Sequence, residues 1–207
     1  YAYEISTGRK IRITNDNTVK PGLTLMLAGR KLLWTMYLSP YSSIDKATFI
    51  YDFDTGTTTE ITGKIGTSIT ISDFDGQRIV LQTGYLSPTN IYLYDLATSQ
   101  LTLIDSGDAN TQGSSVSNPK ISGNKILYKW IGGWNTFWCR ENGLRLYDIA
   151  TGEKTLIFNG FACGGAGDYA IDGDNIIATF ASGSNNPQSI SQYKISTGEG
   201  TFTSSSF

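Results

Sequence analysis

The chain alternates short apolar strands with turns, and one pattern, Tyr-x-x-x-Thr followed by Gly or Ser, occurs five times. In each copy an aromatic and an aliphatic position alternate with polar residues, which is the period of a half-buried β-strand. A second short alternating strand follows every copy. The pattern therefore predicts five tight β-hairpins. The copies are residues 3–8, 51–56, 94–99, 147–152 and 193–198.

A second hairpin pattern lies between these copies. Its turns are centred on Gly29, Gly76, Gly123 and Gly173, which are 47, 47 and 50 residues apart, and an apolar run lies on each side of every turn. Two hairpins per period make a four-stranded antiparallel sheet. Sheets of this size that repeat every 40 to 50 residues, approximately, are the blades of a β-propeller.

Counting strands shows that the first blade is incomplete. The pattern predicts an all-β domain over residues 1–207, a β-propeller of four-stranded blades that has five blades if complete. Four blades are whole, and residues 1–14 supply only an N-terminal half-blade made of two outer strands. The whole blades are residues 20–62, 67–104, 117–158 and 168–204.

Two interpretations of the half-blade remain open. In one, upstream residues were cleaved or not included. In the other, the half-blade edge at Tyr1, Tyr3 and Ile5 pairs with a neighbouring chain, because unpaired strand edges template association.

The propeller register predicts which side chains are buried between blades. They are the aliphatic residues before the Gly turns and the tyrosines of the repeated hairpin. The predicted core is Leu25, Leu27, Ile69, Ile71, Ile121, Ile171, Tyr51, Tyr94 and Tyr147.

The Tyr-Asp-x-x-Thr-Gly hairpin, together with the turn of residues 121–126, resembles the TolB-like propeller repeats of periplasmic, surface and archaeal envelope proteins. It resembles the propeller domains of prolyl-oligopeptidase relatives more distantly. The resemblance covers nearly the whole chain and implies binding or assembly more often than catalysis. It specifies a blade and no activity, because fold and function separate in such scaffolds.

Composition excludes several functional classes. The net charge is −2, and no basic run is present, which argues against nucleic acid and against anionic membranes as partners. The absence of His removes Ser-His-Asp and Cys-His catalysis and every His-ligated metal site. No apolar run is long enough for a membrane helix and no signal peptide is visible, so we expect a mature product or a fragment, with no cofactor and no metal. Ser, Thr and Gly make up a third of the chain, a composition typical of extracellular or cell-surface proteins.

The loop of the fourth blade concentrates aromatic residues. Trp130, Trp134, Phe137 and Trp138 fall within nine residues, followed by Arg140. Such a cluster is suited to stacking on a sugar or to binding a protein. The alternative is that the loop folds over the propeller and has its own small core, because Trp is usually largely buried.

Cys139 lies in the same loop, and Cys163 lies in the connection to the next blade. Propeller topology brings both to one face, and no other Cys competes, so we expect a disulfide and an oxidising compartment. Two free buried thiols are the alternative.

The carboxylates give no catalytic pair. Asp168 is the one acidic residue near the expected channel mouth, whereas a glycoside hydrolase needs two. Residues 105–110 carry oxygen donors that would suit Ca²⁺, but an Asp/Gly turn explains them better. We expect Asp52, Asp95 and Asp148 to accept hydrogen bonds from turn amides.

The sequence as a whole therefore predicts a non-catalytic interaction or structural module that is extracellular or on the cell surface. Its expected partners are copies of itself, other surface proteins or glycans, and self-assembly would produce a surface layer or filament. A carbohydrate-binding propeller that uses the Trp-rich loop is the first alternative. A propeller hydrolase is the second.

Overall fold

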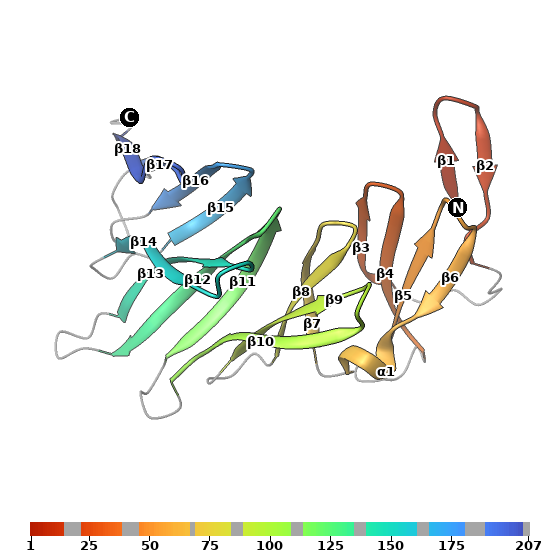
Figure 1. The fold of residues 1–207 in the computed structure, drawn as a ribbon, viewed down its shortest axis with the longest axis horizontal. Coiled ribbons are helices and arrows are strands. Elements are labelled where there is room, and N and C mark those ends of the chain that lie inside the picture. Colours follow the sequence, from red (N-terminus) through yellow and green to blue (C-terminus); the bar gives the residue numbers. More distant parts are fainter. Residues whose placement is uncertain are drawn as a thin grey trace. The chain divides into compact units, whose positions relative to one another are not determined.

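The structure is a computed structural model, and it divides into two compact units, residues 1–68 and residues 69–207. Its described part contains eighteen β-strands and one short helix (Figure 1). The prediction that residues 1–207 form a single domain stays a prediction. The described residues are 1–14, 22–38, 46–66, 69–83, 89–108, 114–134, 140–160, 166–180 and 189–204.

The first unit contains a two-stranded sheet, β1-β2, and a four-stranded antiparallel sheet in the order β3-β4-β5-β6, followed by one helical turn. The elements are β1 (Ala2–Glu4), β2 (Arg9–Ile11), β3 (Gly22–Ala28), β4 (Lys31–Tyr37), β5 (Lys46–Asp52), β6 (Thr57–Glu60) and α1 (Thr62–Ile65).

The second unit contains three four-stranded antiparallel sheets, each made of four consecutive strands. The first is β7 (Ile69–Phe74), β8 (Arg78–Thr83), β9 (Asn90–Asp95) and β10 (Gln100–Ser106). The second is β11 (Ser115–Ser122), β12 (Lys125–Trp134), β13 (Arg140–Asp148) and β14 (Lys154–Gly160). The third is β15 (Ala166–Asp172), β16 (Asn175–Phe180), β17 (Ser189–Lys194) and β18 (Glu199–Ser204).

These sheets confirm the predicted fold class, a propeller with four complete blades and an N-terminal half-blade. The four complete sheets span residues 22–60, 69–106, 115–160 and 166–204. Each boundary lies within two residues of the predicted blade. The half-blade predicted for residues 1–14 is the β1-β2 hairpin.

The repeated hairpin turns have the predicted chemistry. The Oδ1 atom of Asp52 accepts hydrogen bonds from the amides of Asp54 and Thr55, and Asp148 repeats this arrangement. In the third copy the amide of Thr98 donates to Asp95, and this bond is the main reason that the pKa of Asp95 is lowered. The three aspartates therefore stabilise turns, as the sequence predicted.

Two apolar clusters hold the second unit together. In the first, Val80 and Leu93 of one sheet pack with Ile126 and Tyr128 of the next. The second cluster contains buried side chains of β12, β13, β14 and β16. Each full burial of a large aliphatic side chain contributes about 1.5 to 3 kcal/mol of transfer free energy.

Most of the predicted core is confirmed. Ile69, Ile71, Ile121, Tyr51 and Tyr94 are buried, and Ile171 and Tyr147 are half-buried beside the clusters.

Leu25 and Leu27 were predicted to be buried, and this prediction was wrong. Their side chains are 73% and 68% exposed. The reason is that the blade before β3 supplies only two of its four strands in this structure, so the face of β3 that carries these leucines lacks a complete cover.

One buried charged group joins two sheets of the second unit. Asp105 of β10 is only 8% exposed, and its Oδ2 accepts hydrogen bonds from Tyr128 Oη at 2.8 Å and from Arg145 Nη1 at 3.1 Å. Its Oδ1 accepts a bond of 2.8 Å from Lys154 Nζ. Burial raises the pKa of Asp105, but the bonds from Lys154 and Tyr128 and the two positive charges outweigh burial, so the pKa is lowered. Asp105 therefore belongs to this network, and not to the turn that the sequence had predicted there.

The third hairpin copy yields a stability prediction. Its turn places Ser99 at a φ of 57°, whereas the four other copies have Gly at this position with a φ of 69° to 75°, namely Gly8, Gly56, Gly152 and Gly198. An L-residue pays roughly 1–2 kcal/mol in this region, and the greater freedom of unfolded Gly offsets part of the gain. We expect Ser99→Gly to raise the free energy of unfolding by about 0.5–1 kcal/mol in urea titrations. Ser99→Ala is the control, because it keeps the Cβ atom, and equal stability of both variants would contradict the prediction.

The Asp105 network yields a second prediction. Asp105→Ala leaves a buried hydroxyl and two cations without their anion, so we expect a loss of about 2–4 kcal/mol in urea unfolding at neutral pH. Because the folded-state pKa of Asp105 is lowered, its contribution is present above its unfolded pKa and is lost as the pH falls through the folded value. The difference between the wild-type protein and the variant should therefore shrink as the pH is lowered below about 4. The exposed Asp168 provides the control variant, Asp168→Ala, and equal losses for the two variants would contradict the prediction.

Candidate functional site

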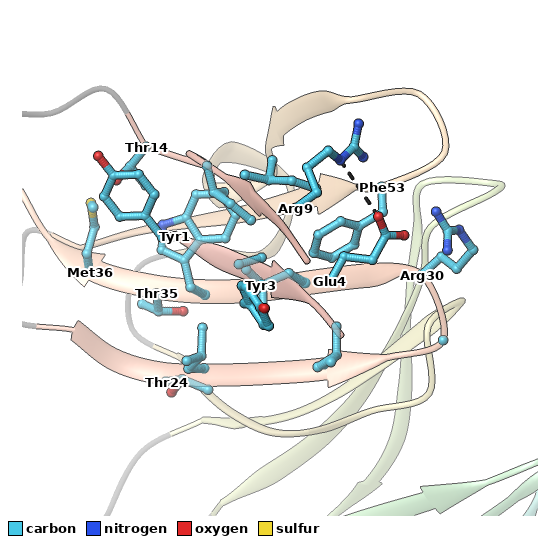
Figure 2. A pocket seen from close by; sticks show the side chains of 18 residues that line it. Tyr1, Tyr3, Glu4, Arg9, Thr14, Thr24, Arg30, Thr35, Met36 and Phe53 are labelled. Atoms are coloured by element: carbon cyan, nitrogen blue, oxygen red, sulfur yellow. Dashed lines mark ion pairs between the residues drawn. The ribbon is translucent and has the colours of Figure 1, made fainter. Parts of the chain in front are cut away.

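An apolar cleft lies in the first unit between the β1-β2 hairpin and the β3-β4 strands. Its volume is about 730 Å³, and it is lined by both strands of the hairpin, by β3, β4 and by Phe53 in the β5-β6 turn. Figure 2 shows Tyr1 and Tyr3 of the hairpin together with Thr24 of β3 and Met36 of β4 around this space.

Strand register shows how unusual the cleft floor is. Leu27 is paired with Leu32 across the β3-β4 turn, and the same positions of the second unit hold Ile121 paired with Ile126. Ile121 and Ile126 are buried, whereas Leu27 is largely exposed. The same repeat position is therefore covered in one sheet and open in the other.

Trp34 adds a polar group to the floor of the cleft. Its ring stacks on Phe49 at a centroid distance of 5.3 Å. Its Nε1 atom is buried and has no acceptor among the residues that the structure describes. A buried N–H without a partner costs about 1–3 kcal/mol.

The hairpin also presents an open strand edge. β1 pairs with β2 from Ala2–Ile11 to Glu4–Arg9, and no other described strand pairs with it. In the complete sheets the strand that carries the same Tyr motif, such as β9 or β13, pairs on both sides. Residues of both β1 and β2 line the cleft.

Charged groups lie at the rim of the cleft. Arg9 Nε is 3.7 Å from Glu4 Oε2, the ion pair drawn in Figure 2, and Thr7 Oγ1 donates a 2.5 Å hydrogen bond to the same carboxylate oxygen. Lys10 Nζ lies 4.6 Å from the centre of the Tyr1 ring. An apolar floor with a charged rim is the usual anatomy of a protein-binding surface.

The predicted assembly edge contributes in part to this cleft. Tyr1 and Tyr3 line it, and both side chains are exposed. Ile5 is 90% exposed but follows the strand and does not line the cleft.

The residues of the predicted Trp-rich site are described in part. Trp130 is half-buried in β12, packs against the first apolar cluster, and has the guanidinium carbon of Arg145 4.2 Å from its ring centre. The backbone of Trp134 pairs with that of Arg140 at the ends of β12 and β13. Phe137, Trp138, Cys139 and Cys163 lie outside the described residues. The predicted ligand site and disulfide therefore stay predictions.

A smaller, polar hollow of about 330 Å³ lies among the inner strands of the second unit, between β7, β11 and β15. Lys120 and Asp168 both line it. Asp168 is exposed there, and no second carboxylate lines the hollow. Among the described residues no group of three His, Cys, Asp or Glu side chains is placed to hold a metal ion. No helix in the described part is long and apolar enough to span a membrane.

Sequence reasoning missed Leu25, Leu27 and Trp34 as candidate site residues. Their apolar alternation predicted a core strand, and the same strands in other repeats are indeed core. The signal that could have identified them was the missing pair of inner strands, because the residues that those strands would cover must be next to the gap.

Comparison of sequences identifies no relative, since no protein-family model and no curated protein matches the chain. Solved structures do match. TolB from Acinetobacter baumannii has 17% sequence identity and a TM-score of 0.56, over 91% of this chain and 45% of TolB. The β-propeller domain of the Trilobed protease from Pyrococcus furiosus, described as having an open velcro topology, has 11% identity and a TM-score of 0.58, over 91% of this chain and 57% of that domain.

Peptidases are also among the similar structures. The acylaminoacyl peptidase of Pyrococcus horikoshii has 12% identity and a TM-score of 0.61, over 88% of this chain and 32% of the enzyme. This chain therefore spans less than two thirds of each of the three structures. At these identities the comparisons show the fold alone, and that fold is the TolB-like β-propeller.

Proposed function

We propose that this propeller is a non-catalytic protein-interaction module whose first unit binds a polypeptide in the cleft beside β1. The exposure of Leu25 and Leu27 is the observation that carries the proposal. Both side chains are largely exposed on a strand whose counterpart in the second unit is covered.

A polypeptide bound in the cleft would remove the apolar surface of these two leucines from water, and this burial favours binding. Exposed leucines that stand alone are ordinary, but in this unit Leu25 and Leu27 share one cleft with Tyr1 and Tyr3. Contiguous apolar patches beside polar rims are typical of binding surfaces. An extended segment can also pair with the open edge of β1, so that main-chain hydrogen bonds add to apolar burial.

The neighbouring structures are consistent with such a role but include peptidase propellers as well as TolB. The described residues supply no paired carboxylates in either hollow, and the sequence has no His. Binding needs only the apolar and main-chain groups that are present. Hydrolysis would need a pair of carboxylates, which neither hollow brings together among the described residues, or a His, which the sequence lacks.

Self-assembly at a cell surface is the specific form of this function that the sequence favours. A contact between the cleft of one copy and a different surface of the next is heterologous, and heterologous contacts that do not close into a ring continue as filaments or layers. The extracellular or cell-surface location belongs to the same proposal, and so do surface proteins or glycans as partners of the Trp-rich loop.

Selection of ligands tests the cleft directly. A displayed library of constrained peptides is selected on the wild-type chain, and the selected peptides are then measured against Leu27→Lys. Leu27 is mostly exposed, so we expect the variant to keep its stability within about 0.5 kcal/mol. Burying a charge in the complex should weaken the selected peptides at least about ten-fold.

The matched control is Leu103→Lys, another exposed leucine on a strand, which does not line the cleft. Failure to enrich any peptide, or peptides that bind both lysine variants equally, would overturn the proposed function.

The predicted disulfide tests the proposed location. If the protein matures in an oxidising compartment, Cys139 and Cys163 should resist alkylation when the protein is denatured without reduction, and both should react after reduction. In the chain-entropy model the bond adds about 3 kcal/mol of stability, so the urea midpoint should fall on reduction. Alkylation of both thiols before reduction would reject the disulfide.

A further inference from the structure

We propose that the polar hollow between β7, β11 and β15 is a second binding site, and that its ligand is a small zwitterion, an α-amino acid with an uncharged side chain. The carboxylate of the ligand binds Lys120, and its ammonium group binds Asp168. The residues that line this hollow all belong to the second unit, and none of them lines the cleft beside β1. The inference therefore goes beyond the proposed function and does not depend on it.

Each of the three strands around the hollow has a β-bulge. In β7 the register shifts by one residue between Ile71 and Asp73. In β11 residues 118 and 119 lie opposite the single residue 128, and in β15 residues 167 and 168 lie opposite residue 179. Bulges turn side chains out of the regular alternation of a strand, and they are frequent beside active sites.

The bulged residues of all three strands line the hollow. Lys120, which directly follows the bulge of β11, lines it as well. Three separate irregularities therefore converge on one place in the second unit. The bulged residues are Ser72, Asn118, Pro119, Gly167 and Asp168.

Asn118 has a strained backbone conformation that neighbouring sheets maintain. Its φ is 53°, a region that L-residues rarely occupy, and the Pro119 that follows favours an extended conformation instead. The amide of Asn118 donates a 2.8 Å hydrogen bond to Gln82 Oε1 of β8, and its carbonyl oxygen accepts a 2.5 Å bond from Tyr169 Oη of β15. Backbone strain that the surrounding structure fixes in this way clusters at functional sites.

The side of the hollow that β15 forms is also fixed. The amide of Asp168 donates a 3.0 Å hydrogen bond to Thr179 Oγ1. A Cβ atom on Gly167 would lie 2.5 Å from the same oxygen, so glycine is needed at this position. Tyr169 Oη accepts a 3.1 Å bond from the amide of Lys129, which connects β15 to the preceding sheet. The hollow is therefore formed before a ligand binds, which lowers the entropic cost of binding.

The charges in the hollow indicate the class of ligand. Lys120 and Asp168 are the two charged residues that line it, and neither side chain has a hydrogen bond or ion pair with any described residue. A ligand with a single charge would be attracted by one of these groups and repelled by the other. A zwitterion is complementary to both.

The size and polarity of the hollow limit the ligand further. Its volume of about 330 Å³ is near the lower end of the range for pockets that hold small molecules, about 300–1,000 Å³. Thr70, Ser72 and the side-chain amide of Asn118 add polar groups to its lining. A free amino acid with an uncharged side chain meets both limits.

Removing one charge of the ligand at a time tests the site. The wild-type chain is titrated calorimetrically with a series of L-amino acids that have uncharged side chains. The amino acid that binds most tightly is then compared with its N-acetyl derivative, which lacks the ammonium group, and with its methyl ester, which lacks the carboxylate. We expect each derivative to bind about ten-fold more weakly, because each has lost one charge-assisted hydrogen bond.

Two variants assign each ligand charge to a residue. Lys120→Met should bind the amino acid about ten-fold more weakly, and it should lose the preference for the amino acid over the methyl ester. Asp168→Asn should lose the preference over the N-acetyl derivative instead. A general loss of folding would not remove the two preferences separately.

The matched controls are Lys194→Met and Asp172→Asn. Both residues are exposed on the same sheet as Asp168, and neither lines the hollow. These two variants should bind the amino acid as the wild-type chain does.

The proposal is overturned if no amino acid of the series binds, or if both derivatives bind as tightly as the amino acid itself. Binding that Lys120→Met and Asp168→Asn leave unchanged would place the ligand elsewhere on the protein. Glucose is titrated in parallel, and binding of this neutral sugar without any amino acid would assign the hollow to a different class of ligand. None of these results alters the peptide selection on the cleft, so either proposal can fail while the other stands.

Discussion

Each sheet of this protein depends on apolar contact with a neighbouring sheet, because its strands carry aliphatic and aromatic side chains on both faces. A single four-stranded sheet cannot bury two faces by itself, so the sheets must stack. In the second unit this stacking buries Val80, Ile126 and Ile176 completely. The hairpin turns, with their aspartates and glycines, set the register that makes these faces meet.

Polar groups between the sheets are tolerated only where they are fully compensated. Asp105 keeps its charge because one hydroxyl and two cations from the next sheet surround it. Replacing such a network by apolar residues often costs little, but removing one member leaves the others buried and unpaired. The network therefore favours one alignment of two sheets over alternatives that apolar packing alone would accept.

The same dependence on stacking explains why the first unit is the candidate binding site. Where the preceding sheet has only β1 and β2, the leucines of β3 and the N–H of Trp34 lack the groups that cover their counterparts. The first unit therefore has a cleft with an apolar floor next to a hairpin whose strand β1 pairs on one side among the described strands.

The sequence by itself determined the repeating unit, since Tyr-x-x-x-Thr turns and Gly turns specify hairpins through local backbone preferences. Blade boundaries, the half-blade and the turn roles of Asp52, Asp95 and Asp148 all follow from such short-range chemistry. Tertiary structure decided which equivalent residues are covered: Ile121 is buried and Leu27 is exposed, although both precede a turn glycine in an apolar strand. It also decided that Asp105 pairs with Lys154, a residue 49 positions away. How exposed a side chain is, and which distant residue it pairs with, depend on the sheet that lies opposite it. The sequence around that side chain does not specify the opposite sheet.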